Sequence, residues 1–203
     1  MGGGVVRLPN PAEYVTVLLF ATTGFTLMAA AQQLLLAFLA LELASLSLYV
    51  LAGFDKSRPE SAEAALKYFL FGGISAAFLL FGFSLIYGLT GSIELTEISR
   101  QIGNQPASTL LVVALGMILV AFGFKAAAAP FHLWAPDVYQ GAPASSAALI
   151  ASASKLAGFT LFVRLLWGGF GAAPGHSAMP SWLPVVAIIA AVSLVLGNLA
   201  ALA

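Results

Sequence analysis

The sequence has no cysteine, only two histidines, and charged side chains at just 8% of its 203 residues. A chain without cysteine holds no disulfide, no thiolate metal site and no cysteine-ligated iron–sulfur cluster. The two histidines, His132 and His176, lie far apart in the sequence and show no metal-ligand spacing. We therefore expect no redox centre, cofactor or metal site in this chain.

Charge is scarce in both signs. Eight basic and eight acidic side chains give a net charge of zero, so the composition points to no nucleic-acid partner. A soluble domain carries roughly 25% charged residues, whereas 61% of this chain is hydrophobic. Too few charged side chains remain to cover a water-facing surface, and the composition predicts an integral membrane protein. The apolar run after residues 1–14 is too long for a cleavable signal peptide.

Six apolar runs reach the length of about 20 residues that a membrane-spanning helix needs. We predict an all-α, polytopic transmembrane helix bundle that forms a single membrane domain over residues 1–203. The predicted spans cover about residues 12–31, 33–53, 61–88, 108–129, 144–167 and 181–203. Arginine and lysine are almost evenly divided between the two sides, so the sequence predicts no orientation.

A short helix with one apolar face is predicted between the third and fourth spans, in ELTEISRQIG. A helix of this kind typically lies at the membrane surface with its apolar side chains in the interface. The side chains expected on that face are Ile93, Leu95, Ile98 and Ile102.

Residues 121–143, AFGFKAAAAPFHLWAPDVYQGAP, start as a membrane helix and then interrupt it. Pro130 offers no amide hydrogen to the carbonyl of Ala126, and it disfavours helical angles at Ala129. The sequence therefore predicts one broken helix in the Lys125–Pro130 region. Irregular backbone at membrane depth persists only where protein buries it or water reaches it, so the break marks a candidate functional site.

Four charged side chains lie inside the apolar spans, and they are Glu42, Lys67, Lys125 and Lys155. Snorkelling to the membrane surface accounts well for Lys67, near its helix start, and acceptably for Lys125. It accounts poorly for Glu42 and Lys155, which lie near the middle of their runs. A structural ion pair is a second alternative. The functional hypothesis is a proton or cation pathway, because ionisable groups buried in a membrane usually mark such pathways.

The broken segment holds three further candidates. His132 is a candidate proton shuttle, and a hydrogen bond to the broken backbone is an equal alternative. Asp137 is a candidate relay acid, although a helix cap after Pro136 or a contact with a neighbouring loop is favoured. Trp134 fits packing or an interfacial belt better than a ligand site.

Three segments resemble a known family: residues 41–50 (LELASLSLYV), 66–92 (LKYFLFGGISAAFLLFGFSLIYGLTGS) and 123–156. They are similar to the antiporter-like subunits of respiratory complex I, and most of all to subunit N of bacteria, called subunit 2 in mitochondria. The stretch PFHLWAPDVYQGAP carries the most specific part of the likeness. The resemblance covers nearly all of the chain.

The resemblance implies roles for matching positions only. Glu42 corresponds to the family's glutamate, Lys125 to the lysine of its broken helix, and Lys155 to the lysine of the helix after it. Lys67 matches a lysine typical of subunit N, and His132 would lie near the helix break. The implied function is proton translocation, driven by NADH oxidation and quinone reduction elsewhere in the complex.

The likeness extends only over helices four to nine of the family, and the second inverted repeat has no counterpart here. A half-channel needs its mate, so we expect either a fragment or a separate chain that supplies the missing C-terminal helices. Other expected partners are membrane subunits of complex I and lipids, with NAD, FMN, iron–sulfur clusters and quinone in partner subunits. The expected location is the mitochondrial inner membrane or the bacterial plasma membrane. Alternatives are a subunit of a cation/proton antiporter or membrane-bound hydrogenase, and a non-transporting assembly scaffold.

Overall fold

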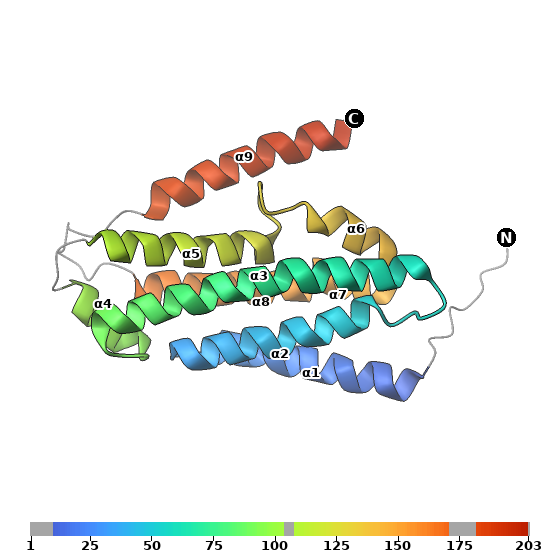
Figure 1. Cartoon of the computed structure of the whole chain (residues 1–203), viewed down its shortest axis with the longest axis horizontal. Helices are drawn as coiled ribbons and strands as arrows, with labels where there is room; N and C mark the ends of the chain where they lie inside the picture. Colours follow the sequence, from blue (N-terminus) through green and yellow to red (C-terminus); the bar gives the residue numbers. More distant parts are fainter. Residues whose placement is uncertain (1–9, 104–107, 171–181, 203) are drawn as a thin grey trace.

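A computed structural model describes residues 10–103, 108–170 and 182–202 of the chain. These residues form a bundle of long helices, together with one isolated β-bridge between Gln33 and Glu94 (Figure 1). The helices are α1 (Pro11–Ala30), α2 (Leu34–Ala52), α3 (Pro59–Thr90), α4 (Leu95–Gly103), α5 (Thr109–Ala126), α6 (Trp134–Gly141), α7 (Ala144–Ala151), α8 (Ala153–Val163), η1 (Arg164–Gly169) and α9 (Trp182–Leu202). His176 and the glycine- and proline-rich stretch around it lie outside the described residues.

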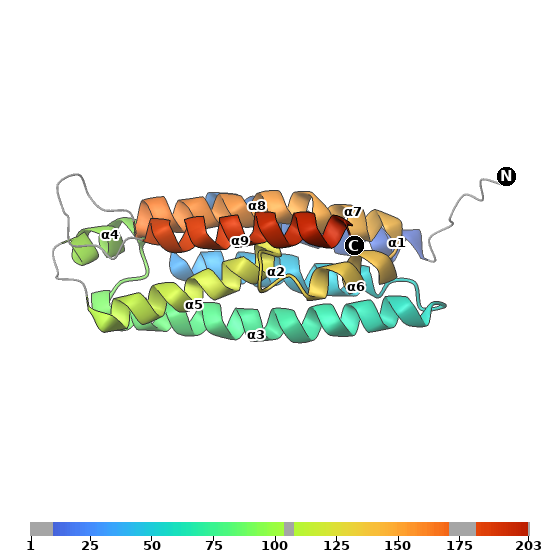
Figure 2. The same ribbon diagram turned by 90° about the horizontal axis from the view of Figure 1, so that it is seen from above.

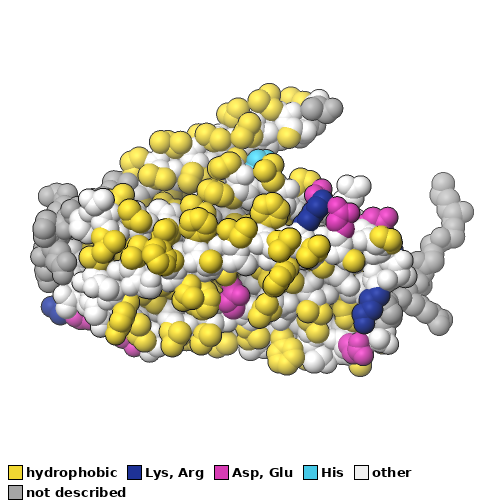
Figure 3. All heavy atoms as spheres, in the orientation of Figure 1, with side chains coloured by type: hydrophobic (Ala, Val, Ile, Leu, Met, Phe, Trp, Pro, Cys, Tyr) yellow, Lys and Arg dark blue, Asp and Glu magenta, His cyan; other side chains and the backbone are white. Residues whose placement is uncertain are grey.

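Six helical segments are long and apolar enough to cross a membrane, which confirms the predicted all-α architecture. Five of these segments are single helices, and the remaining one, Ala144–Gly169, combines α7, α8 and η1. Hydrophobic side chains cover the middle of the face seen in Figure 3, whereas charged side chains gather mainly toward its ends. That distribution is the one a bilayer requires of a spanning bundle.

The turn between α1 and α2 is fixed by the segment that precedes α4. The amide of Leu34 donates to the carbonyl of Ile93 at 2.8 Å, and the amide of Leu95 donates to Gln32 at 2.9 Å. The Gln33 side chain donates to Glu94 at 2.6 Å. Backbone groups that a tight turn leaves without a helical partner are thereby satisfied.

The prediction that α4 turns its apolar face to the membrane interface is wrong for this structure. Leu95, Ile98 and Ile102 are all less than 7% exposed, because η1 packs against α4 and Leu95 lies against Gly169. The polar face of α4 does reach water, where a hydrogen bond from Arg100 holds the pKa of Glu97 down at about 2.

The fifth predicted span is confirmed in position but is not one regular helix. Ser152 leaves helical geometry with φ of −113° and ψ of −84°, which separates α7 from α8. Its hydroxyl donates to the carbonyl of Ala148 at 2.6 Å, a local bond that competes with regular helix hydrogen bonding. The span ends in the π-helical turn η1.

Small residues let the helices approach closely, as expected where lipid offers no hydrophobic driving force between helices. A Cβ on Gly24 of α1 would lie 2.6 Å from the amide nitrogen of Ala44 on α2. Helix α9 differs from the others, since it lies at an angle above the bundle (Figures 1 and 2) and is largely exposed.

We predict that Gly24→Ala destabilises the protein, although alanine favours a helix over glycine by about 0.5–1 kcal/mol. The added Cβ would meet backbone atoms of α2, and overpacking of this kind costs about 1–3 kcal/mol. The measurement is the thermal unfolding midpoint in detergent. The control is Gly116→Ala in α5, where a Cβ meets nothing within 4 Å. Equal midpoints for the two variants would contradict the prediction.

Candidate functional site

The site is built around the break between α5 and α6. Helix α5 ends at Ala126 and α6 begins at Trp134, so the interruption predicted from the prolines is present. Ala127 turns the chain with a left-handed φ of 56°, and for this reason α5 ends before it reaches the predicted limit at residue 129. The Ala129–Pro130 peptide bond is cis.

Two backbone hydrogen bonds close the last turn of α5. The amide of Ala127 donates to Phe124 at 2.9 Å, and the amide of Ala128 donates to Gly123 at 2.8 Å. This is the Schellman arrangement, in which the left-handed position usually holds glycine. Alanine in that conformation costs roughly 1–2 kcal/mol because its Cβ crowds the following carbonyl.

Side chains from two other helices supply further donors to this helix end. The Trp134 indole nitrogen of α6 donates to the carbonyl of Phe124 at 3.2 Å. The Lys155 ammonium of α8 donates to the carbonyl of Lys125 at 2.8 Å. The last carbonyls of a helix have no intrahelical partner and carry the negative end of its dipole. A cation is therefore well placed there.

Lys125 is buried, with only 4% of the residue exposed. Its ammonium donates to the hydroxyl of Ser45 on α2 at 3.2 Å. Its stem crosses Gly158 of α8, where a Cβ would lie 2.9 Å from Cγ of the lysine. Gly158 thus leaves the space through which the side chain reaches α2.

Glu42 lies on α2, three positions before Ser45, so both side chains project from one face of the helix. The carboxylate is within electrostatic range of Lys125, but the described residues include no direct salt bridge between the two. One carboxylate oxygen is buried without a hydrogen-bond partner among the described residues. An unpartnered buried oxygen of this kind is costly, and it marks a place for a further proton or donor.

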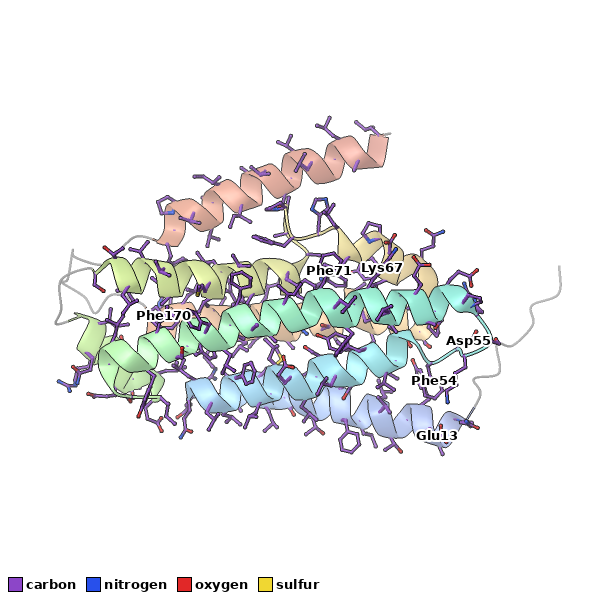
Figure 4. All side chains as sticks on the ribbon, viewed as in Figure 1. Glu13, Phe54, Asp55, Lys67, Phe71 and Phe170 are labelled. Carbon is purple, nitrogen blue, oxygen red and sulfur yellow. The ribbon has the colours of Figure 1, made fainter. Side chains whose placement is uncertain are left out.

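Lys67 lies apart from the buried lysines. Its ammonium pairs with Glu63 of α3 at 2.7 Å and with Asp137 of α6 at 2.5 Å, and its side chain is 38% exposed. Figure 4 shows Lys67 on the side of α3 that faces α6. The structure therefore brings Glu42, Lys125 and Lys155 together around the break and leaves Lys67 at the polar surface of the same helix bundle.

His132 lies within the break, between α5 and α6. Its Nδ1 atom is buried and has no hydrogen-bond partner among the described residues, while its backbone carbonyl accepts from Ala135 at 2.9 Å. This ring nitrogen is therefore open to a further hydrogen-bond partner. No group of three metal-ligating side chains forms among the residues that the structure describes.

A cavity of about 290 Å³ lies between α5, α8 and α9, and both Lys125 and Lys155 line it. Its wall is otherwise mainly apolar. Ser193 of α9 also lines the cavity, and its hydroxyl accepts from the amide of Ala129 at 2.9 Å. The break is thus tied to α9 as well as to α8.

Sequence reasoning missed Ser45, Gly158 and the role of Trp134 at the helix end. Gly158 follows Lys155 by three positions, a spacing that places both on one helix face. Ser45 follows Glu42 in the same way. Spacing from a buried charge was the available signal for both residues, whereas nothing in the sequence linked Trp134 to a carbonyl ten residues earlier.

Comparisons with known proteins show the family to which the chain is similar. The family model described as "NADH:quinone oxidoreductase/Mrp antiporter, TM" matches residues 31–203. NADH-quinone oxidoreductase subunit N 2 of Acidobacterium capsulatum is 54% identical over 195 residues, which cover 94% of this chain and 39% of that protein. The chain therefore spans about two fifths of the length of the curated relatives it matches.

Solved structures show the same similarity. Respiratory complex I from Thermus thermophilus with bound aureothin contains a chain that is 42% identical, with a TM-score of 0.78, covering 98% of this chain and 41% of that one. The membrane-bound sulfane sulfur reductase, an archaeal respiratory membrane complex, contains a chain that is 26% identical, with a TM-score of 0.76, covering 92% of this chain and 37% of that one.

We predict that Ala127→Gly stabilises the protein by about 1 kcal/mol, because glycine adopts a positive φ without the Cβ penalty. The measurement is again the unfolding midpoint in detergent. The neighbouring variant Ala126→Gly is the control, since Ala126 is still helical and glycine there should not stabilise. A lower midpoint for Ala127→Gly than for the unchanged protein would refute the assignment of strain to this position.

Proposed function

The chain belongs to the NADH:quinone oxidoreductase/Mrp antiporter transmembrane family, and from this premise we propose that it is a membrane subunit of a proton-pumping NADH:quinone oxidoreductase. It contributes a half-channel of buried Glu and Lys side chains to that complex. The observation that carries the proposal is the buried Lys125 ammonium at the end of a broken helix, with the Lys155 ammonium bound to the carbonyl of the same residue.

In this half-channel Lys125 takes up and releases the proton. A protonated Lys125 is favoured by the negative charge of Glu42 and disfavoured by the positive charge of Lys155. Its direct acceptor is the neutral hydroxyl of Ser45, which holds an ammonium less firmly than a carboxylate does. A change of charge on Glu42 or Lys155 therefore shifts the proton on Lys125.

Lys155 receives the proton next and passes it on. The Lys155 ammonium binds the backbone carbonyl of Lys125, and both lysines line the cavity between α5, α8 and α9. Water in that cavity would bridge the two amines. His132, with its unpartnered ring nitrogen in the break, is a further acceptor along this route, and Lys67 serves at the water-exposed end of the pathway.

NADH oxidation and quinone reduction take place elsewhere in the complex under this proposal, with NAD, FMN, iron–sulfur clusters and quinone in partner subunits. The partners are other membrane subunits of the complex, lipids, and a separate chain or segment that supplies the C-terminal helices of the subunit. Residues 1–203 act as one membrane domain in an energy-coupling membrane. The similarity to respiratory complex I and to subunit N relatives supports these assignments.

We predict that Lys125→Ala and Lys155→Ala each lower the rate of proton pumping by roughly tenfold or more, because each removes a proton-transfer group. The measurement is acidification of proteoliposomes that hold the assembled complex, after assembly has been checked on native gels. Lys56→Ala, which removes an exposed lysine in the loop between α2 and α3, is the matched control. Unchanged pumping in both test variants would remove the transport proposal and favour an assembly scaffold.

The second candidate is a cation/proton antiporter subunit, which the name of the family model supports. The same proteoliposomes separate the two candidates. Replacement of Na⁺ by K⁺ in the buffer should leave pumping unchanged if the proton is the transported ion. A rate that falls with the Na⁺ concentration would instead favour the antiporter.

Lys67→Ala is expected to lower pumping less than Lys125→Ala does, because water can replace an amine at an exposed position. Its ion pairs with Glu63 and Asp137 are partly exposed, and such pairs contribute only about 0–1 kcal/mol to stability. The unfolding midpoint should therefore change little. A loss of pumping as large as that of Lys125→Ala would place Lys67 in the main transfer path.

A further inference from the structure

The proposed pathway assigns no function to Trp134, a buried aromatic side chain at the site. Trp134, the first residue of α6, is only 2% exposed. The ring of Tyr68 stacks on it at a centroid distance of 4.7 Å and an interplanar angle of 7°. The Lys155 ammonium lies over the same indole, 4.7 Å from the ring centroid. Trp134 therefore contacts a charged group of the site directly.

The same indole is fixed to the end of α5 by its edge. Its nitrogen donates to the carbonyl of Phe124 at 3.2 Å, and the Lys155 ammonium donates to the next carbonyl, that of Lys125, at 2.8 Å. Two neighbouring carbonyls thus bind two donors that also contact one another. A shift of the indole would move the surface on which the Lys155 ammonium rests.

The indole face suits an ammonium in apolar surroundings. Its π electrons attract a cation, tryptophan does so more strongly than tyrosine or phenylalanine, and the attraction grows when water is excluded. The ring accepts no proton itself, and it stabilises the ammonium less than a carboxylate would. A carboxylate in that place would form a salt bridge and hold the charge on the lysine.

We propose that Trp134 is a positioning residue, whose indole holds the Lys155 ammonium against the C-terminal carbonyl of α5 in line for proton exchange with Lys125. This inference rests on the proposed function, in which the two lysines exchange a proton. The proposed role depends on the attraction between the π electrons of the indole and the ammonium, and not only on the shape of the ring.

The test replaces Trp134 by tryptophans that carry one, two, three and four fluorines on the ring, introduced at this position alone in the intact complex. Each fluorine withdraws electron density from the ring face and weakens its attraction for a cation, while the shape hardly changes. Fluorination does not weaken the indole N–H as a donor, so the bond to Phe124 remains. The readouts are proton pumping in proteoliposomes and NADH:quinone reductase activity in detergent.

The expected result is a stepwise fall in pumping with fluorine number, to about a tenth with four fluorines, at unchanged assembly. The same series at Trp167 is the control, since that side chain is 74% exposed and its ring contact is Trp182. Equal pumping across the Trp134 series, or an equal fall in the Trp167 series, would overturn the inference.

Two simpler variants keep the inference testable by ordinary mutagenesis. Trp134→Phe retains a ring face and should keep part of the pumping, whereas Trp134→Leu should lose more at equal assembly. Where the leucine variant does not assemble, the fluorinated series decides.

Failure of the proposed function can be distinguished from failure of the role of Trp134. If the proposed function is wrong, Lys125→Ala and Lys155→Ala pump normally. If those variants lose pumping while the fluorinated series stays level, only the role of Trp134 is refuted.

Discussion

The need to satisfy backbone carbonyls at the end of a helix that stops inside the bundle determines most of this structure. Each buried carbonyl without a donor costs about 1–3 kcal/mol, so a helix can stop at membrane depth only where other groups supply the missing donors. At the end of α5 the donors come from Ala127 and Ala128 of the break, from Trp134 of α6 and from Lys155 of α8. The break therefore holds three helices together.

The same constraint explains why two lysines lie close together without a carboxylate between them. Lys155 is held by the negative end of the α5 dipole and by the indole face, and Lys125 is held by a serine hydroxyl. Neutral acceptors support an ammonium more weakly than a direct salt bridge does. Among the described residues, neither amine is thus held by a direct salt bridge to a carboxylate. Glu42 acts from beyond direct contact.

The sequence was sufficient for the large features and insufficient for the contacts. Apolar run length predicted all six spans, because a bilayer sets that length directly. The prolines predicted the break, because proline acts on its own helix. The burial of α4 was missed, since an apolar helix face does not reveal whether lipid or protein covers it. Likewise the irregular turn at Ser152 has no strong sequence signal, because serine is tolerated in helices as well as in kinks.

The same distinction applies to the site residues, since the sequence identified the buried charges but not their partners. Charges inside apolar runs identified Lys125 and Lys155 as members of one site, since burial makes them rare. The partners of these charges depend on which helices meet, and this is a matter of packing. Lys67 shows the difference, because its place near a helix start allowed a surface position to be expected, whereas its partners Asp137 and Glu63 could not be read from the sequence.

Helix α6 links these two environments. Trp134 and Asp137 are three positions apart, which places them on neighbouring parts of one short helix. Through Trp134 the helix contacts the buried Lys155, and through Asp137 it contacts the exposed Lys67. Close packing of Gly141 on the backbone of Glu60 leaves α6 little room to move independently of α3. One short helix of two turns thus contacts both the buried lysine and the exposed lysine, and its packing on α3 fixes where the two contacts lie.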